Sequence, residues 1–349
     1  MATQADLPGV SYVMPVLNEV DYVEDAVRTI LSQDYAGEQQ LILALGPSTD
    51  GTMAVVERLV AQDPRVTFVL NPNRHIPVGL NLAVQASKHP IIVRVDAHSE
   101  LAPGYTARAV ETLLRTGAVN VGGLMKAKGR SPFQWAVARA YNSKFGLGGG
   151  TYHGGDAEGP AESAYLGVFR HEVLTEVGLY DESLRRGEDW ELNLRIRAAG
   201  HVVWFDPELK VTYWPRENWN KLTRQFFTTG VWRGELVRRH PGKNPWRFFV
   251  PPLLVLAVVL GVVGIVLQAT GVLGWPWSIL AYLDYAGLLA YALLVVGVAF
   301  TIDRGKTARD ALIFMLVLPT MHLSWGTGFI RGLLHGGRDT MDTSRSNRN

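Results

Sequence analysis

The pattern of apolar and polar positions divides the chain into two parts. Over the first 240 residues, short apolar runs alternate with segments whose apolar residues recur at helical spacing. This alternation is typical of βαβ units, in which helices cover a mainly parallel sheet. From Phe248 onward, apolar residues dominate. The pattern predicts an α/β domain over residues 1–241, a membrane region over residues 242–335 and a polar tail over residues 336–349.

The expected elements of the α/β domain follow one another in a regular order. We predict strands at residues 10–16, 41–45, 65–70, 91–95 and 119–125. We predict helices at residues 21–33, 53–61, 79–87 and 187–199. Open α/β sheets bind their ligands beyond the carboxyl ends of the strands, so the residues that follow each strand are the first candidates for a site.

Two apolar segments, residues 248–267 and 279–301, are long enough to cross a membrane. A hydrocarbon core of about 30 Å requires about 20 helical residues, and both segments reach this length. The uncharged loop between them holds Trp275 and Trp277, which suit the outer interface. Basic residues flank the other ends of both segments: Arg238, Arg239, Lys243, Arg247, Arg304, Lys306 and Arg309. The positive-inside rule therefore predicts a multi-pass protein of the plasma membrane whose α/β domain is cytoplasmic.

A third apolar segment, residues 311–334, leaves two interpretations open. Five residues interrupt its apolar pattern: Pro319, His322, Gly326, Gly328 and Arg331. A full span would place the arginines of the tail outside, against the charge rule, whereas a re-entrant or interfacial helix would keep the tail inside. Of these two interpretations we expect the full span.

Composition narrows the classes of function. The net charge of the 349 residues is only +2, so we expect no nucleic-acid partner. The chain has no cysteine, which excludes disulfides, thiolate zinc sites and thiol nucleophiles. The first residues carry neither a basic region nor an apolar stretch of the kind found in signal peptides, which agrees with a cytoplasmic N-terminal domain.

The most informative short motif lies at residues 93–98, where an apolar run ends in Asp96 and, two positions later, His98. Side chains alternate along a strand with period two, so both can point the same way at the carboxyl end of the strand. Two such ligands aimed at one point indicate a divalent metal. The alternative is a strand that ends in an Asx-type turn, with His98 in a structural role.

Further motifs follow other predicted elements. Pro15-Val16-Leu17-Asn18-Glu19 closes the first strand, and Ser48-Thr49-Asp50-Gly51-Thr52 precedes a helix. With the acidic strand end at Asp96, their order resembles family 2 glycosyltransferases of the GT-A fold, a Rossmann-like fold, over residues 10–241. Three more motifs resemble the membrane-anchored glycosyltransferases of succinoglycan-type exopolysaccharide synthesis: Asp96-Ala97-His98-Ser99, Gly187-Glu188-Asp189-Trp190-Glu191-Leu192-Asn193, and Trp232-Arg233 followed by His240-Pro241.

The resemblance implies a nucleotide-sugar donor, with UDP-hexoses as the leading candidates, and Mn²⁺ or Mg²⁺ as cofactor. Asp96 and His98 would hold the metal, which neutralises the leaving diphosphate. The implied donor-binding residues are Pro15, Asn18, Glu19, Asp50, Arg74, Asn81 and Asp96. Two positions depart from the family pattern, because His98 replaces the second aspartate of Asp-x-Asp and the acidic residue expected before Ser48 is missing. The second departure leaves the base of the donor unassigned. The segment with Arg74 and Asn81 can also be read as an ordinary loop that leads into a capped helix.

The same resemblance implies the catalytic group of an inverting transfer. Asp189 would take the proton of the acceptor hydroxyl, and Glu188 would contact the acceptor or the sugar. Alternatively, these carboxylates only stabilise the first turn of a helix. The basic and aromatic segment at residues 216–241 would be an interfacial part of the domain that carries a lipid-linked acceptor. Trp190, Gln225, Trp232 and Arg233 would contact the acceptor or the diphosphate. Its charges can also serve only as a topology signal.

These observations lead to one expectation and two alternatives. We expect a membrane-anchored inverting glycosyltransferase that moves a hexose from a nucleotide sugar to a polyprenyl-phosphate-linked saccharide in cell-envelope or exopolysaccharide synthesis. The first alternative is a polyprenyl-phosphate sugar synthase, whose acceptor is the bare lipid phosphate. The second is a membrane scaffold that has kept the fold without the activity.

Overall fold

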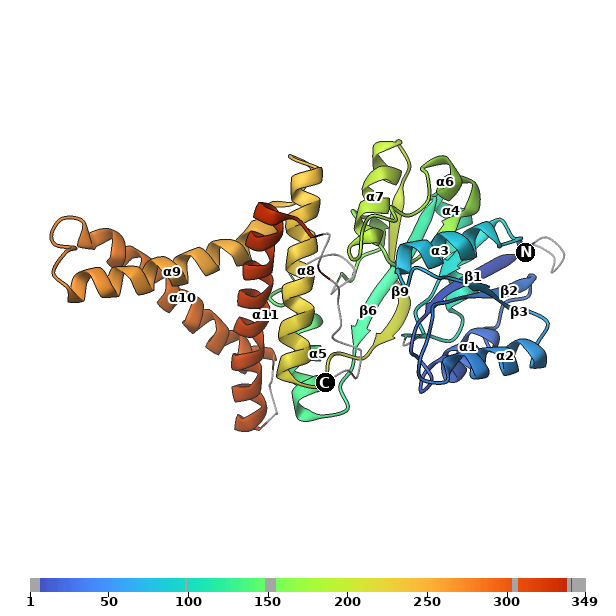
Figure 1. Cartoon of the computed structure of the whole chain (residues 1–349), viewed down its shortest axis with the longest axis horizontal. Coiled ribbons are helices and arrows are strands. Elements are labelled where there is room, and N and C mark those ends of the chain that lie inside the picture. The colour runs from blue at the N-terminus through green and yellow to red at the C-terminus, as the bar shows by residue number, and fades with distance from the viewer. Residues whose placement is uncertain (1–6, 98, 148–154, 303–306, 338–339, 341–349) are drawn as a thin grey trace. The chain divides into compact units, whose positions relative to one another are not determined.

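The computed structural model describes residues 7–97, 99–147, 155–302, 307–337 and 340 (Figure 1). The chain forms two compact units. Unit 1 comprises residues 1–128 and 149–214 and contains the sheet, whereas unit 2 comprises residues 129–148 and 215–349 and is helical. The structure therefore groups residues 216–241 with the apolar helices, whereas the sequence analysis assigned this segment to the α/β domain.

Within the described residues, nine strands of unit 1 form one mixed sheet in the order β3-β2-β1-β4-β8-β6-β9-β5, with β7 paired to β9. The strands β1, β2, β3 and β4 are parallel neighbours, and β8 is antiparallel to both β4 and β6. The strand bounds are β1 Val10–Val16, β2 Gln39–Leu45, β3 Val66–Leu70, β4 Ile91–Arg94, β5 Ser99–Leu101, β6 Asn120–Ala127, β7 Gly159–Pro160, β8 Tyr165–Arg170 and β9 Val203–Tyr213. The mostly parallel α/β fold agrees with the prediction.

Helices cover both faces of the sheet because its central strands are apolar on both sides. Apolar side chains of α1, α2 and α4 pack with those of β1 and β2 in one core. Side chains of α3, α6 and α7 fill a second core on the opposite face. The helix bounds in unit 1 are α1 Val23–Leu31, α2 Thr52–Gln62, α3 Ile76–Gln85, α4 Tyr105–Thr116, α6 His171–Glu176 and α7 Glu188–Ala198.

The carboxyl ends of three adjacent parallel strands meet at one edge of the sheet. Val13 of β1 lies opposite Arg94 of β4, and Pro15 of β1 lies opposite Ala44 of β2. The backbone N–H of Val95 donates to the carbonyl of Val13 at 3.0 Å, which carries this alignment past the end of β4. The loops after β1, β2 and β4 therefore emerge side by side, as the predicted site requires.

Four strands of the sheet were not predicted from the sequence: the short strands β5 and β7 and the longer strands β8 and β9. β8 contains Gly167, whose missing side chain leaves room for Asn120 and Phe169. β9 contains Pro207 and a register shift against β6, so neither strand shows a regular apolar period. At the shift, Gly123 of β6 lies against the backbone of Leu209, and any Cβ at this position would collide with the Leu209 carbonyl.

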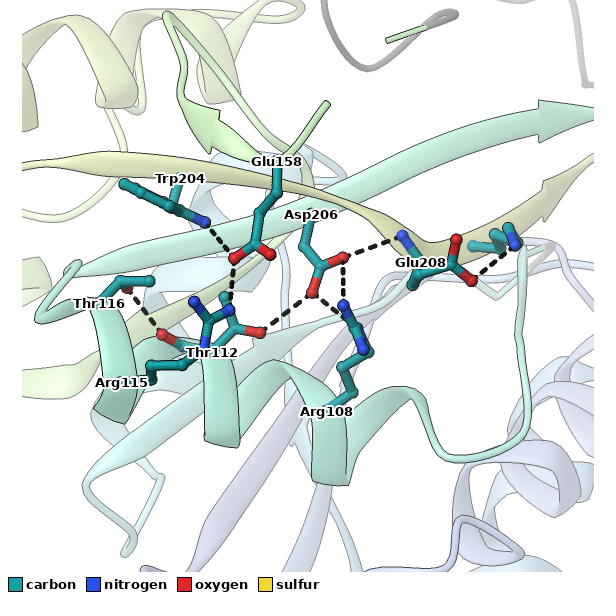
Figure 2. A network of polar contacts seen from close by, with 9 residues as sticks. Arg108, Thr112, Arg115, Thr116, Glu158, Trp204, Asp206 and Glu208 are labelled. Atoms are coloured by element: carbon teal, nitrogen blue, oxygen red, sulfur yellow. Dashed lines mark hydrogen bonds and ion pairs between the residues drawn. The ribbon is translucent and has the colours of Figure 1, made fainter. Parts of the chain in front are cut away.

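A buried carboxylate fixes the irregular part of β9, as Figure 2 shows. Asp206 is fully buried and accepts hydrogen bonds from Arg108 Nε at 2.8 Å and from the Thr112 hydroxyl at 3.0 Å. It also accepts from the backbone N–H of Glu208 at 2.9 Å. Burial alone would raise the pKa of Asp206, but the hydrogen bonds from Arg108, Glu208 and Thr112 outweigh it and lower the pKa. Asp206 thus links the register shift of β9 to helix α4 by hydrogen bonds.

Unit 2 consists of α5 Pro132–Tyr141, α8 Trp219–Arg239, the short 3₁₀ helix Trp246–Phe249, α9 Val250–Ala269, α10 Ser278–Ile302 and α11 Ala308–His335. Three helical segments of the described chain, 246–269, 278–302 and 308–335, have the length and composition of membrane spans. The first two agree with the predicted spans. The third continues without a break through Pro319, so the residues that interrupt its apolar pattern do not end the helix.

We predict that Asp206→Ala lowers the stability of the protein by about 2 kcal/mol, because Thr112 and the Glu208 N–H lose a buried acceptor. In thermal unfolding of the detergent-solubilised protein, this corresponds to a melting temperature lower by about 4–8 °C. The pKa of Asp206 is lowered on folding, so its contribution is present at neutral pH and is lost as the pH falls through that lowered pKa.

The difference between wild type and Asp206→Ala should therefore shrink below about pH 4. Glu208→Gln is the matched control, because the Glu208 side chain is exposed and its backbone N–H still reaches Asp206. Equal melting temperatures for wild type and Asp206→Ala at neutral pH would contradict this account.

Candidate active site

One buried arginine brings together three carboxylates of unit 1. Arg94 ends β4 and is 4% exposed. Its Nη2 donates to Glu188 Oε1 at 3.0 Å and lies 3.6 Å from Asp96 Oδ1, and its Nη1 pairs with Asp189. Asp96 follows β4, whereas Glu188 and Asp189 form the first turn of α7. Residues almost one hundred positions apart thus share a single guanidinium group.

The charges of this cluster depend on one another. Burial by itself would lower the pKa of Arg94, but Asp96, Glu188 and Tyr180 more than compensate and raise it, so the guanidinium stays charged. The ring of Tyr180 lies 5.9 Å from the Arg94 guanidinium carbon and closes the cluster on another side. The three carboxyl groups outnumber the single guanidinium group, and this excess of acidic groups favours the binding of a divalent cation nearby.

Hydrogen bonds hold the start of α7 and the backbone of Tyr180 in place. The side-chain amide of Asn81 donates to the Tyr180 carbonyl at 2.9 Å and accepts from the Tyr180 N–H at 2.9 Å. One turn into α7, Glu191 accepts from Arg195, which also donates to the Leu179 carbonyl at 2.7 Å. Asn193 accepts from Asn120 of β6 at 2.6 Å. These contacts fix α7 to the sheet, so the cluster forms on a rigid support.

The loops after β1 and β2 are linked by their side chains. Asn18 has a positive φ of 56°; its N–H donates to the Ser48 hydroxyl at 3.0 Å, and its side chain accepts from the Thr49 N–H at 2.8 Å. Asp50 accepts from the N–H groups of Val20 and Thr52. Burial alone would raise the pKa of Asp50, but the hydrogen bonds from Thr52 and Val20 lower it. Asp50 therefore stabilises the conformation of the loops after β1 and β2.

The structure brings one group of the predicted site residues together and separates others from it. Asp96, Glu188 and Asp189 meet at Arg94, and Pro15, Asn18, Glu19 and Asp50 lie at the ends of the neighbouring strands β1 and β2. Asn81 is engaged in holding Tyr180, and Arg74 is exposed with a positive φ of 58°. Trp190 is buried in unit 1. His98, the second predicted metal ligand, lies outside the described residues.

The predicted acceptor residues of α8 belong to unit 2. Gln225 and Trp232 are buried, and the indole N–H of Trp232 donates to the Thr340 carbonyl at 3.0 Å. The guanidinium carbon of Arg233 lies 4.3 Å from the ring centroid of Phe248. Their contacts with unit 2 are structural, and their roles toward an acceptor stay predictions.

The donor set around Asp96 suits a metal that is shared with a substrate. Among the described residues no cluster of three or more His, Asp or Glu side chains is arranged to hold a metal by itself. The side chain of Asp96 is 18% exposed, and its Oδ1 lies 3.6 Å from Arg94 Nη2. Mg²⁺ and similar ions are commonly bound by one or two carboxylates together with phosphate oxygens and water. This donor set therefore fits a metal bound together with a diphosphate.

The sequence analysis missed Arg94 and Tyr180. The sequence did mark Arg94 as unusual, because it is the charged residue in an otherwise apolar run, Ile91-Ile92-Val93-Arg94-Val95. A charge inside a buried strand requires oppositely charged partners, so it should be read as a sign of carboxylates nearby. Tyr180 gave no such signal, because its loop lies outside the predicted elements.

Comparisons with known proteins identify the family of the chain. The family model described as "Glycosyl transferase family 2" matches residues 11–178. The chain is 32% identical to the succinoglycan biosynthesis protein ExoA of Rhizobium meliloti (strain 1021) over 325 residues, which cover 92% of this chain and 94% of that protein. The chain therefore belongs to glycosyltransferase family 2.

One further relative and one solved structure match nearly the whole chain. A dolichyl N-acetyl-alpha-D-glucosaminyl phosphate 3-beta-D-2,3-diacetamido-2,3-dideoxy-beta-D-glucuronosyltransferase of Methanococcus voltae is 22% identical over 336 residues, covering 94% of this chain and 98% of that protein. Among solved structures, the mannosyltransferase PcManGT from Pyrobaculum calidifontis, in complex with GDP-Man and Mn²⁺, matches with a TM-score of 0.59 and 20% identity. That match covers 95% of this chain and 88% of that chain, and it supports the GT-A-like fold.

We predict that Arg94→Met destabilises the protein by about 3 kcal/mol, because it leaves the buried Glu188 carboxylate without its cation. Arg94→Lys should lower the stability of the protein less than Arg94→Met, since lysine keeps the positive charge but not the forked geometry of the guanidinium group. The measurement is thermal unfolding in detergent at neutral pH.

Tyr180→Phe is the matched control. The Tyr180 hydroxyl has no hydrogen-bond partner among the described residues, so its removal should leave the melting temperature unchanged or raise it. A melting temperature for Arg94→Met equal to that of wild type would contradict the role of Arg94 in the cluster.

Proposed function

We propose that this protein is a membrane-anchored inverting glycosyltransferase. It transfers a hexose from a nucleotide sugar to a lipid-linked saccharide, with Asp189 as the general base. The observation that carries the proposal is the convergence of Asp96, Glu188 and Asp189 on Arg94, beside the carboxyl ends of the parallel strands. An inverting transfer needs a base near the sugar and a charge-neutralising group near the diphosphate, and this cluster contains candidates for both.

The donor lies along the edge formed by the loops after β1, β2 and β4 in this proposal. The linked loops at Asn18 and Asp50 border the nucleotide, and Asp96 lies at the diphosphate. A divalent cation held there by Asp96 would stabilise the negative charge of the departing diphosphate. A UDP-hexose is the proposed donor, and Mn²⁺ or Mg²⁺ the proposed metal. The structure of PcManGT contains GDP-Man and Mn²⁺, which supports this choice of ligand class.

Asp189 and Glu188 differ in exposure, and the difference suggests a division of roles. The side chain of Asp189 is 29% exposed, whereas that of Glu188 is 9% exposed. An acceptor hydroxyl can therefore reach Asp189, which takes its proton while the oxygen attacks the anomeric carbon. Glu188 is engaged with Arg94 and positions the cluster. Arg94 orients both carboxylates and keeps the base from turning away from the sugar.

The acceptor is proposed from the helical unit and from the relatives. The length and apolar composition of helices α9 and α10 support an attachment to a membrane, where lipid-linked saccharides are found. The Methanococcus voltae relative is named as a transferase that acts on a sugar attached to dolichyl phosphate. The relative ExoA is named for succinoglycan biosynthesis. We therefore place the transfer on the cytoplasmic face of the plasma membrane, in polysaccharide or cell-envelope synthesis, with a polyprenyl-linked saccharide as acceptor.

Replacing the base is the first test. We predict that Asp189→Asn lowers the transfer rate by about 10²- to 10⁴-fold without weakening donor binding, because the amide keeps the shape and cannot accept the proton. Transfer is measured with radiolabelled UDP-hexoses and a glycosylated polyprenyl diphosphate, and donor binding by titration calorimetry. Glu57→Gln is the control, because Glu57 is an exposed carboxylate on α2. Full activity of Asp189→Asn would rule out Asp189 as the base.

Replacing the proposed metal ligand is the second test. Chelation should abolish transfer by wild type, and added Mn²⁺ or Mg²⁺ should restore it. Asp96→Asn should require a higher Mn²⁺ concentration for half-maximal activity, because a neutral amide binds hard cations more weakly than a carboxylate. Donor-dependent binding of Mn²⁺ by electron paramagnetic resonance provides a second readout. Activity that is unaffected by chelation would contradict the proposed metal dependence.

The same assay separates the alternative acceptors. A polyprenyl-phosphate sugar synthase would glycosylate the bare lipid phosphate, whereas the proposed enzyme requires the glycosylated carrier. Thin-layer analysis of the products with both carriers distinguishes these outcomes. Failure to transfer with every donor and carrier, despite donor binding, would favour the scaffold.

A further inference from the structure

We propose that helix α11 does not cross the bilayer but lies along its surface, as one of two paired interfacial helices with α8. Its partner is the boundary between lipid headgroups and acyl chains. The membrane is then crossed by the hairpin of α9 and α10 alone, and the chain after α11 stays on the side from which α9 enters. This replaces the full span that the sequence favoured.

Helices α9 and α10 form a hairpin. Near the loop that joins α9 and α10, Gly264 lies against Ala281 and Tyr285, and the Tyr285 hydroxyl donates to Gln268 Oε1 at 3.1 Å. The two helices are therefore antiparallel neighbours at their loop ends. If both cross the membrane, the start of α9 at Val250 and the end of α10 at Ile302 lie on the same side.

Helix α11 begins near the end of α10 and leads to the start of α9. Ala308 begins the helix only six residues after the end of α10, so α11 starts on that same side. Eighteen residues later, Gly326 lies against the carbonyl of Pro251 in the first turn of α9. The rings of Trp325 and Phe329 contact Phe248 and Phe249, which precede α9, with centroids 6.4 and 5.6 Å apart.

The contact of Gly326 with the start of α9 argues against a crossing. Eighteen helical residues advance about 27 Å, nearly the thickness of a hydrocarbon core. A spanning α11 would therefore bring Gly326 close to the far end of α9, near Ala269. Instead it meets the start of α9, so α11 runs between two points on one side of the membrane. In Figure 1, α11 correspondingly lies across the open ends of the hairpin, alongside α8.

The pairing with α8 supports the same placement. Gly230 and Gly234 of α8 lie against the backbone of α11, and Gly328 and Gly332 of α11 lie against the backbone of α8. Small residues four apart on both helices allow this close approach. Helix α8 carries six charged residues and is not among the candidate spans of the described chain: Lys221, Arg224, Arg233, Glu235, Arg238 and Arg239. A helix in backbone contact with α8 over two turns must lie at the same depth as α8.

The chain beyond α11 also returns to α8. The Trp232 indole N–H donates to the Thr340 carbonyl at 3.0 Å, and Arg331 donates to the Thr340 hydroxyl at 2.6 Å. Gly337 lies against the ring of Trp232. The end of α11 is therefore attached to the helix that leads into the membrane hairpin from its near side.

The outer face of α11 has the chemistry of an interfacial helix. Five aliphatic side chains recur at helical spacing on the face turned away from the α8 contact and are exposed or half-buried: Leu312, Leu316, Leu323, Ile330 and Leu334. Arg309, Arg331 and His335 flank this stripe and are exposed. An apolar stripe bordered by basic residues suits burial among acyl chains with the charges at the headgroups.

Cysteine labelling tests the side on which α11 ends, and the chain, having no native cysteine, needs no altered background. Single variants His335→Cys, Lys243→Cys and Val272→Cys are prepared in sealed vesicles of known orientation and treated with a membrane-impermeant maleimide. Lys243 precedes α9 and Val272 lies in the hairpin loop, and both are exposed. We expect His335→Cys to react from the same side as Lys243→Cys. Reaction from the side of Val272→Cys would overturn the proposal.

Spin labels test the depth of α11, including the case in which His335→Cys reacts from neither side. Labels at Leu312, Leu316, Leu323, Ile330 and Leu334 are compared for collision with oxygen and with a water-soluble nickel complex. An interfacial helix predicts one shallow depth for all five positions. A depth that passes through a maximum in the middle of the series would show a crossing and overturn the proposal. Neither measurement depends on the proposed enzymatic activity.

Discussion

The buried guanidinium group of Arg94 must be paired with carboxylates, and this requirement determines the arrangement of the candidate site. Arg94 is part of the interior of the sheet, and a guanidinium in that position is stable only with anionic partners. Asp96 comes from its own strand end, and Glu188 and Asp189 come from a helix that the chain reaches much later. The requirement for pairing therefore brings the residue proposed to hold the metal and the residue proposed to be the base to a common point.

The rest of unit 1 supports this arrangement from two sides. The parallel strands β1, β2 and β4 align the loops that are proposed to receive the donor, and the antiparallel strand β8 lets the chain return across the sheet toward α6 and α7. Asn81 and Asn193 then fix the loop and the helix that carry Tyr180 and the two carboxylates. These hydrogen bonds between buried polar groups favour one geometry of the cluster, which a site for directed transfer requires.

The sequence predicted the parts of the structure that are encoded locally. The apolar runs of β1, β2 and β4 and the helical spacing of α1 and α2 appear where they were expected, because each pattern reflects burial on a nearby element. β9 was missed, since its bulge depends on Asp206 meeting Arg108 from another element. The proximity of Asp96 to Asp189 came from family resemblance, whereas Arg94, which links them, depends on contacts between distant parts of the chain. The path of α11 could not be predicted either, because a helix of 28 apolar-rich residues suits both a span and a surface, and only its neighbours decide.

The central claim is that the Arg94 cluster forms the place of glycosyl transfer, with Asp96 beside the diphosphate and Asp189 beside the sugar. The most direct measurement is a crystal structure of the full chain with Mn²⁺ and a non-hydrolysable UDP-hexose analogue, with data collected at the manganese absorption edge. We predict an anomalous peak within bonding distance of the Asp96 carboxylate, and an anomeric carbon that faces Asp189. A manganese ion bound away from Asp96, or a sugar with its anomeric carbon remote from Asp189, would contradict the account.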